Sequence, residues 1–311
     1  LYLNLVINGT NSVGCTADYA VYCEGNLNIS GSGELSTNNT TAGIGARKEI
    51  QYSDATVSID TENNAVESGG SDITVLSGKI LAESGRIAAE NGKITIKNGE
   101  VKTNRALCLG VFSMEDGAFS GGISSTNGGI SSTNGGVNVS GGSITSASNI
   151  EIGYQNLTIS GGSISMKGGV CILAGNVNAT GGIIDIENTE NSTCISTTWH
   201  VKASETAKIT VKTGEATAIE GQLITEGNAE VYAEGSTGVW CTAATHEING
   251  GNVTVIGNSS AGIGSGWNGV TINGGTVVAE GKEYAINAVA QNSDTITING
   301  GTVTATGGVQ A

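Results

Sequence analysis

Short stretches of alternating apolar and polar residues recur along the whole chain, and glycines punctuate them. Residues 270–281 read VTINGGTVVAEG, and close copies begin at residues 137, 157, 246 and 296. Alternation over a few residues indicates a β-strand with one buried face, and the central Gly-Gly pair indicates a turn. Each copy therefore predicts two short strands joined by a turn.

A third, shorter apolar stretch lies upstream of each copy, and its central aliphatic residue serves as a marker of the repeat. These markers are Val21, Ile44, Val66, Ile87, Leu107, Ile130, Ile150, Val170, Ile195, Ile219, Val239, Ile263 and Ile286. Successive markers are 20 to 25 residues apart, with no helical pattern between them. This period leaves a stacked β-solenoid or a blade-type repeat, and a propeller blade needs about 40 residues.

The pattern thus favours an all-β fold, a parallel β-helix with three sheets and about 13 coils, one for each marker. We expect residues 1–311 to form a single β-helix domain. The absence of proline agrees with this fold, because nearly every strand lies between two neighbours and each backbone N–H is needed in a ladder. The chain begins and ends within a strand pattern, so we expect it to be part of a longer protein. Free strand edges at the end coils would invite end-to-end self-association.

Asparagines precede several of the Gly-Gly pairs, at Asn249, Asn273 and Asn299. Equivalent positions of successive coils lie above one another in a solenoid. These side chains are therefore either a stacked amide ladder or ordinary solvated turn residues. The sequence leaves both alternatives open.

Two segments, AVYCEGNLNISGSGEL at 20–35 and AGIGSGWNGVTINGGTVVAEG at 261–281, resemble repeats of secreted and cell-surface proteins of Firmicutes. The resemblance implies a pectate-lyase-like right-handed parallel β-helix, similar to the clostridial carbohydrate-binding β-helix family. It also implies a secreted or cell-surface location. The shared residues are the fold-forming ones, so the resemblance says more about architecture than about activity.

Charge narrows the classes of partner. The chain carries 13 basic and 28 acidic residues, a formal net charge of −15. Nucleic-acid binding depends on neutralising phosphates with lysine and arginine, so we expect no nucleic-acid partner. No apolar run approaches the roughly 20 residues of a membrane helix, and we expect no membrane insertion.

An enzyme of this architecture would need charged side chains from neighbouring coils on one face, such as the paired carboxylates of a glycosidase. Glu67, Glu151 and Glu220 share one offset from their markers, but three or four coils separate them. They cannot act on one bond, and we interpret them as surface carboxylates. We therefore identify no catalytic residue, although a polysaccharide lyase or glycoside hydrolase remains the least favoured alternative.

Candidate metal ligands are sparse. Asp185, Glu187 and Glu190 lie on or just after one strand and are the one place where calcium is considered, although calcium takes six or more oxygen ligands. We assign no metal site and no cofactor. The two histidines, His200 and His246, stand in different coils, so they form neither a zinc site nor a triad. His246 replaces the aliphatic residue of other copies, and we expect it to point inward or into a turn with a local hydrogen bond.

The aromatic residues form the one constellation typical of binding. Tyr154, Trp199 and Trp267 each lie four residues after a marker, so we expect them along one corner of the solenoid. Their coils are two and three rungs apart, which is about 10 and 14 Å at the usual strand spacing. Trp240 follows its marker directly and should point outward. The alternative is that each ring separately covers its own turn.

These observations predict a non-catalytic, extracellular β-helix module that binds carbohydrate or acts as an adhesin. Its partner would be a glycan or another cell-surface polymer, and its candidate binding residues are Tyr154, Trp199, Trp267 and Trp240. A neutral glycan fits the acidic chain better than a polyanion. The alternative is a structural spacer or stalk of a surface protein.

Overall fold

The structure is a computed structural model that describes all residues except 15–17, 39–40, 126–134, 170, 289–294 and 309–311. The regular elements of the described residues are β-strands, and together they form a parallel β-solenoid of about 12 turns. The chain divides into two compact units. Unit 1 comprises Leu1–Ser146 and Ile150–Gly153, and unit 2 comprises Ala147–Asn149 and Tyr154–Ala311.

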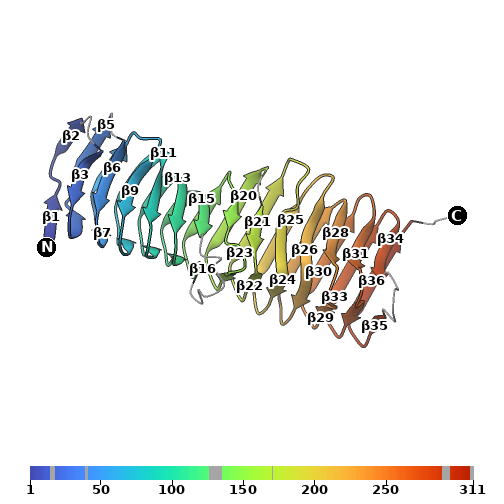
Figure 1. The fold of residues 1–311 in the computed structure, drawn as a ribbon. Helices are drawn as coiled ribbons and strands as arrows, with labels where there is room; N and C mark the ends of the chain where they lie inside the picture. Colours follow the sequence, from blue (N-terminus) through green and yellow to red (C-terminus); the bar gives the residue numbers. More distant parts are fainter. Residues whose placement is uncertain (15–17, 39–40, 126–134, 170, 289–294, 309–311) are drawn as a thin grey trace. The chain divides into compact units, whose positions relative to one another are not determined.

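In unit 1, drawn from blue to green in Figure 1, each strand pairs with its equivalents in the preceding and following coils, which gives three parallel sheets. The first sheet has the order β1 (Tyr2–Val6), β4 (Asn26–Ser30), β7 (Ile50–Tyr52), β10 (Ile73–Val75), β12 (Ile94–Ile96), β14 (Val111–Met114) and β16 (Gly136–Val139). The second has β2 (Thr10–Gly14), β5 (Glu34–Asn38), β8 (Thr56–Ile59), β11 (Lys79–Ala89), β13 (Glu100–Cys108), β15 (Ala118–Ser125) and β17 (Ser143–Ser146). The third has β3 (Tyr19–Cys23), β6 (Ala42–Ala46) and β9 (Asn64–Ser68), the second halves of β11, β13 and β15, and β18 (Ile150–Glu151).

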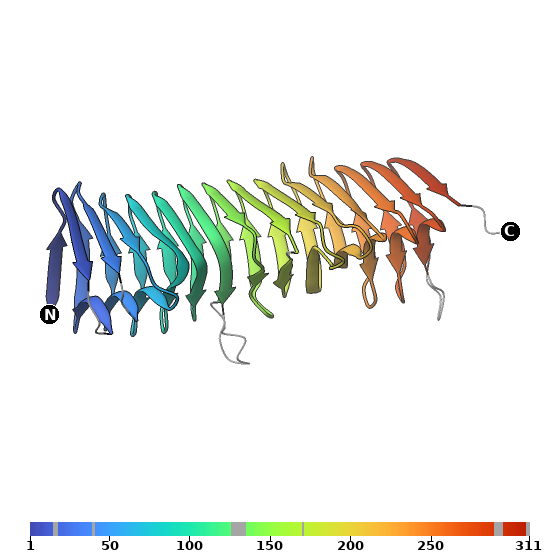
Figure 2. The same ribbon diagram turned by 90° about the horizontal axis from the view of Figure 1, so that it is seen from above.

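Unit 2 repeats this arrangement, and Figure 2 shows its strands in yellow-green to red from above. Its first sheet has β19 (Asn156–Ile159), β22 (Asn176–Ala179), the second halves of β24 (Ile195–Ala203) and β26 (Thr217–Thr225), then β29 (His246–Ile248), β32 (Val270–Ile272) and β35 (Ile296–Ile298). Its second has β20 (Ser163–Gly168), β23 (Ile183–Asn188), β25 (Lys208–Lys212), β27 (Glu230–Gly235), β30 (Asn252–Gly257), β33 (Thr276–Gly281) and β36 (Thr302–Gly307). Its third has β21 (Ile172–Ala174), the first halves of β24 and β26, β28 (Thr237–Cys241), β31 (Ala261–Ser265) and β34 (Tyr284–Ala288).

The predicted stacking of aliphatic residues is confirmed. Val21 pairs with Ile44, and Ile44 pairs with Val66, in a parallel register. Most inward positions of the inner coils are filled by isoleucine, valine, leucine and alanine, and a few by larger side chains such as those of Tyr52, Phe112 and Phe119. A single coil has no second layer against which to bury these side chains, so each coil covers the apolar residues of the next.

One predicted marker, Leu107, does not occupy the stacked position. Ala106, not Leu107, pairs with Ile87, and both Ala106 and Cys108 are buried. Because side chains alternate between the faces of a strand, this one-residue difference turns Leu107 outward. The rung position before Ile150 belongs to Ile123, and the one before Ile195 belongs to Ile172; Ile130 and Val170 lie outside the described residues.

The turns carry a ladder of amide hydrogen bonds, which settles the alternative left open by the sequence. The side-chain amide of Asn273 donates to Asn249 Oδ1 at 2.7 Å, and that of Asn299 donates to Asn273 Oδ1 at 2.7 Å. A similar amide contact, at the other end of the first-sheet strands, joins Asn176 and Asn156 at 2.9 Å. Each side-chain amide thus forms a hydrogen bond with an asparagine one coil away, in addition to the backbone hydrogen bonds between strands.

Within the described part of the chain, no helix has the length and apolar character needed to cross a membrane.

Candidate functional site

Exposed aromatic residues gather in unit 2 where each coil passes from the third sheet to the first. We call the positions that follow one another along this edge the aromatic corner, and they are Tyr154, Gly175, Trp199, Gly221, Ala243, Ala244 and Trp267. The backbone fixes their order, since Trp199 N–H donates to Gly175 O at 3.0 Å and Gly175 N–H donates to Gln155 O at 2.7 Å. Further along, His200 pairs with Gln222, which places Gly221 beside Trp199.

Tyr154, Trp199 and Trp267 are 63%, 51% and 61% exposed, so none of them is a core residue. The rings of Tyr154 and Trp199 have centroids 6.2 Å apart and are inclined by 46°. This separation is shorter than the 10 Å expected from two rungs, because Gly175 stands between them without a side chain. A Cβ on Gly175 would lie 2.6 Å from Trp199 Cζ3. The glycine therefore allows the two rings to meet over it.

A groove of about 270 Å³ opens on the other side of Trp199. It crosses three successive coils and is lined by Thr197, Thr198, Trp199, Glu220, Gly221, Gln222, Cys241, Thr242, Ala243 and Ala244. Because Gly221 has no side chain and Ala243 and Ala244 have small ones, no side chain of the described residues fills the space between Trp199 and Trp267.

Trp267 lies beyond the groove, three coils after Trp199, which is about 14 Å at the usual strand spacing. Two hydrogen bonds hold the turns that carry it. Asn268 Nδ2 donates to Ala243 O at 2.7 Å, and Thr245 Oγ1 donates to Asn268 O at 2.9 Å. The aromatic corner therefore presents a paired platform, a low stretch, and a third ring.

Trp240 lies on the third sheet beside this corner and is half-buried. It is in register with Glu220 on one side and Gly264 on the other. A Cβ on Gly264 would lie 2.8 Å from Trp240 Cζ3, so the indole covers that glycine. The structure thus places Trp240 next to the groove, with one face of its ring used in packing.

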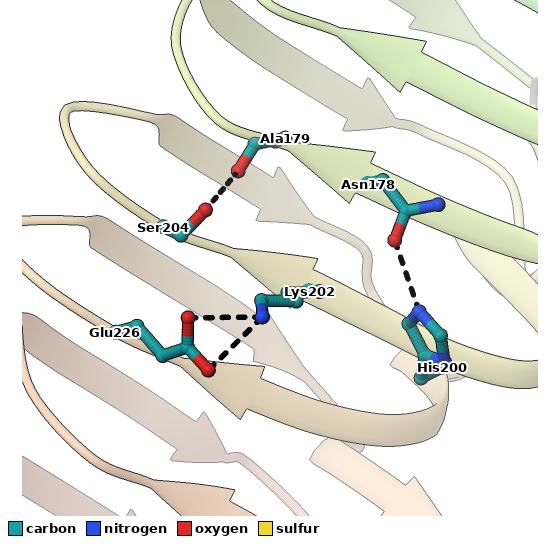
Figure 3. Close-up of polar contacts among 6 residues, drawn as sticks. All are labelled: Asn178, Ala179, His200, Lys202, Ser204 and Glu226. Atoms are coloured by element: carbon teal, nitrogen blue, oxygen red, sulfur yellow. Dashed lines mark hydrogen bonds and ion pairs between the residues drawn. The ribbon is translucent and has the colours of Figure 1, made fainter.

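On the first sheet, next to the corner, polar and charged side chains contact one another, as Figure 3 shows. Lys202 Nζ lies 2.9 Å from Glu226 Oε2, and His200 Nε2 lies 3.0 Å from Asn178 Oδ1. Burial, and secondarily the charge of Lys202, lower the pKa of His200 below its usual value. His200 is therefore neutral at physiological pH, and this face adds no unpaired cation to the corner.

Glu67, Glu151 and Glu220, which share one offset in the sequence, have different neighbours in the structure. Glu67 accepts hydrogen bonds from Tyr19 Oη at 2.9 Å and from Asn64 Nδ2 at 2.6 Å. Glu151 lies 3.1 Å from Arg105, and Glu220 lines the groove. Each of the three thus belongs to a different local environment.

Around Glu67, unit 1 forms a polar hollow that the sequence did not reveal. Its walls include Asp18, Tyr19, Asn64, Glu67 and Arg86. Burial and the adjacent carboxylate raise the pKa of Tyr19 to about 12, so its hydroxyl stays protonated and donates to Glu67. Only the pairing of β3, β6, β9 and β11 brings these residues together, since their separations in the sequence are irregular.

The described residues include no cluster of three or more His, Cys, Asp or Glu side chains placed to hold a metal. Of the residues considered for calcium, Glu187 is ion-paired with Lys167 at 2.7 Å. His246 is fully buried, as expected for an inward residue. Its Nδ1 accepts from Leu223 N–H at 3.0 Å, and its Nε2 lies 3.0 Å from Gly264 O.

No family model matches the chain, and neither the curated proteins nor the solved structures include a significant match.

Proposed function

We propose that the protein is a non-catalytic module that binds a glycan along the aromatic corner of unit 2. The observation that carries this proposal is the succession of three exposed rings, Tyr154, Trp199 and Trp267, along one edge, with a groove beside Trp199 that is lined largely by small and hydroxylated residues. Pyranose rings have apolar faces that stack on aromatic side chains, and their edges carry hydroxyls that need polar partners. The groove offers the hydroxyls of Thr198 and Thr242 for that purpose.

The ligand class follows from charge. The groove has one charged lining residue, Glu220, and the chain as a whole is acidic. Such a surface disfavours polyanionic polysaccharides and suits a glycan without acidic groups. The resemblance to secreted and cell-surface β-helix proteins supports an extracellular setting and a role in adhesion. A pure spacer would have no need of exposed rings around a groove, so we place that function second.

Affinity electrophoresis and calorimetry against a panel of uncharged plant, microbial and mucosal oligosaccharides would test the proposal. Removing a ring that stacks on the ligand should weaken binding about tenfold or more. We therefore expect this loss for Trp199→Ala and for Trp267→Ala.

Tyr2→Ala is the matched control, because Tyr2 is 75% exposed and belongs to unit 1, so it is not part of the aromatic corner. It should leave affinity unchanged. Circular dichroism would verify that each variant retains its strand content. The absence of binding to every glycan in the panel, or equal affinity of Trp199→Ala and the parent protein, would contradict the proposal.

A further inference from the structure

Among the described residues, Glu220 places a carboxylate without a partner side chain in the groove. Glu220 is exposed, and none of the described side chains forms a hydrogen bond or ion pair with its carboxylate. Its backbone, by contrast, is fixed: Glu220 O accepts from Thr197 Oγ1 at 3.3 Å, and the residue pairs with Ser196 and Trp240 in the third sheet. A rigid strand thus holds a free anionic group at the edge of an aromatic groove.

The lysines of the coil that carries Trp199 already have partners, Lys202 on the first sheet and Lys208 and Lys212 on the second. Lys202 is paired with Glu226 at 2.9 Å, and Lys208 with Glu230 at 3.3 Å. Lys212 lies over the ring of Tyr232, 5.1 Å from its centroid. The described residues that line the groove include no lysine or arginine. A cationic group of a ligand would therefore meet Glu220 without competition from a side chain of the groove.

The groove places aromatic surface and negative charge side by side. Trp199 and Glu220 line the same groove, and the indole of Trp240 lies next to Glu220 in register. An ammonium group is attracted both to a carboxylate and to the face of an indole ring. A sugar ring stacked on Trp199 would carry its substituents at its rim, and the Glu220 carboxylate would attract an amino group among them.

We propose that the groove prefers glycans that carry free amino groups, such as oligomers of glucosamine, over the same glycans in N-acetylated form. This inference rests on the proposed function, since it requires a glycan on the aromatic corner. It adds a chemical selection that the rings alone do not provide. Hydroxylated sugars still bind through the rings and threonines, while the amino group adds a charge-assisted contact to Glu220.

The test is the ratio of two affinities, measured by calorimetry with glucosamine and N-acetylglucosamine oligomers of equal length. At low ionic strength we expect the deacetylated oligomer to bind about two- to fivefold more tightly, the upper part of the range of an exposed charge pair. Glu220→Gln should bring the ratio close to one. Because the ratio is the readout, a general loss of affinity in the variant does not imitate the effect.

Glu280→Gln is the matched control: it removes one exposed carboxylate from β33 of the second sheet, outside the groove, and should leave the ratio unchanged. If uncharged glycans bind and the ratio of the parent protein is already one, the inference is wrong while the proposed function stands. If neither oligomer nor any other glycan binds, both fail. A tetralysine peptide that binds as tightly as the deacetylated oligomer, and depends on Glu220, would show a general cation site and also overturn the inference.

Discussion

His246 shows how one buried polar side chain can link stability to pH. Its imidazole is wholly buried among three successive coils, with Leu223 N–H donating to one nitrogen and Gly264 O accepting from the other. This geometry requires the neutral ring, since a second ring proton would face the Leu223 N–H. Burial accordingly lowers the pKa of His246 from 6.5 to about 4.

The consequence is a loss of stability in acid. Between pH 6.5 and about 4 the unfolded chain binds a proton at His246 that the folded chain does not, so the free energy of unfolding decreases as the pH falls through this window. A difference of about 2.5 pKa units corresponds to about 3 kcal/mol, all of which is lost below pH 4. Urea unfolding followed by circular dichroism at several pH values would measure this slope.

His246→Val separates this effect from the titration of carboxylates, because it introduces the aliphatic residue found at Val270 in the next coil. The variant should be less stable at pH 7, since it leaves the N–H of Leu223 and the carbonyl of Gly264 without their partner. Its stability should depend less on pH between 6.5 and 4. An unchanged slope would show that His246 is not the group responsible.

Individual residues also explain why the site was only partly predictable from the sequence. The common spacing of Tyr154, Trp199 and Trp267 after their markers matches their exposed positions between the third and the first sheet. It did not reveal that Tyr154 and Trp199 touch, because that contact depends on the missing side chain of Gly175. The groove was not foreseen either, since Gly221 and Ala243 are unremarkable in a chain with 50 glycines.

At the scale of strands, alternation and period predicted the parallel stacking, while the register was harder to assign. Leu107 looked like the buried residue of its strand, yet Ala106 and Cys108 take the inward positions. A small alanine and a cysteine form a weaker apolar signal than leucine, so the pattern favoured the wrong alternation. Ile123 and Ile172 were missed because the lengths of the neighbouring turns vary from coil to coil.

The interior strands give a direct test of why proline is absent from the chain. β30 lies between β27 and β33, and Thr254 pairs with Tyr232 on one side and Val278 on the other. Its side chain points outward, so the backbone ladder is the main constraint at this position. Proline would remove an N–H and leave a ladder partner unmatched.

We expect Thr254→Pro to lower the free energy of unfolding by about 2–4 kcal/mol, the combined effect of a lost hydrogen bond and an unsatisfied buried group. Thr254→Val keeps the N–H and a β-branched side chain, and should change stability by about 0.5 kcal/mol or less. Urea unfolding midpoints of the two variants would show whether the backbone ladder or the side chain limits substitution at this position. Equal midpoints would mean that side chains, and not the ladder, limit substitution here.

Across the whole molecule, the excess of acidic over basic residues affects stability more than the individual ion pairs do. The chain has a formal net charge of −15, whereas the eight ion pairs of the described residues all lie at the surface. Exposed pairs contribute little to stability, and salt screens them. Repulsion among the unpaired carboxylates opposes the compact state and is screened by the same salt. The two effects have opposite signs, so the response to salt shows which one dominates.

We expect repulsion to dominate, because many carboxylates remain without a cation within reach. Raising sodium chloride from about 10 to 150 mM shortens the Debye length from about 30 to 8 Å and should raise the melting temperature by a few degrees. Sucrose at equal osmolality is the control, since it is excluded from protein surfaces without screening charge. A melting temperature that falls with salt would show that the ion pairs, among them Lys202 with Glu226, outweigh the repulsion. Added salt should also bring the affinity ratio of glucosamine to N-acetylglucosamine oligomers closer to one. Salt screens the attraction between the amino groups and Glu220, while the aromatic contacts persist.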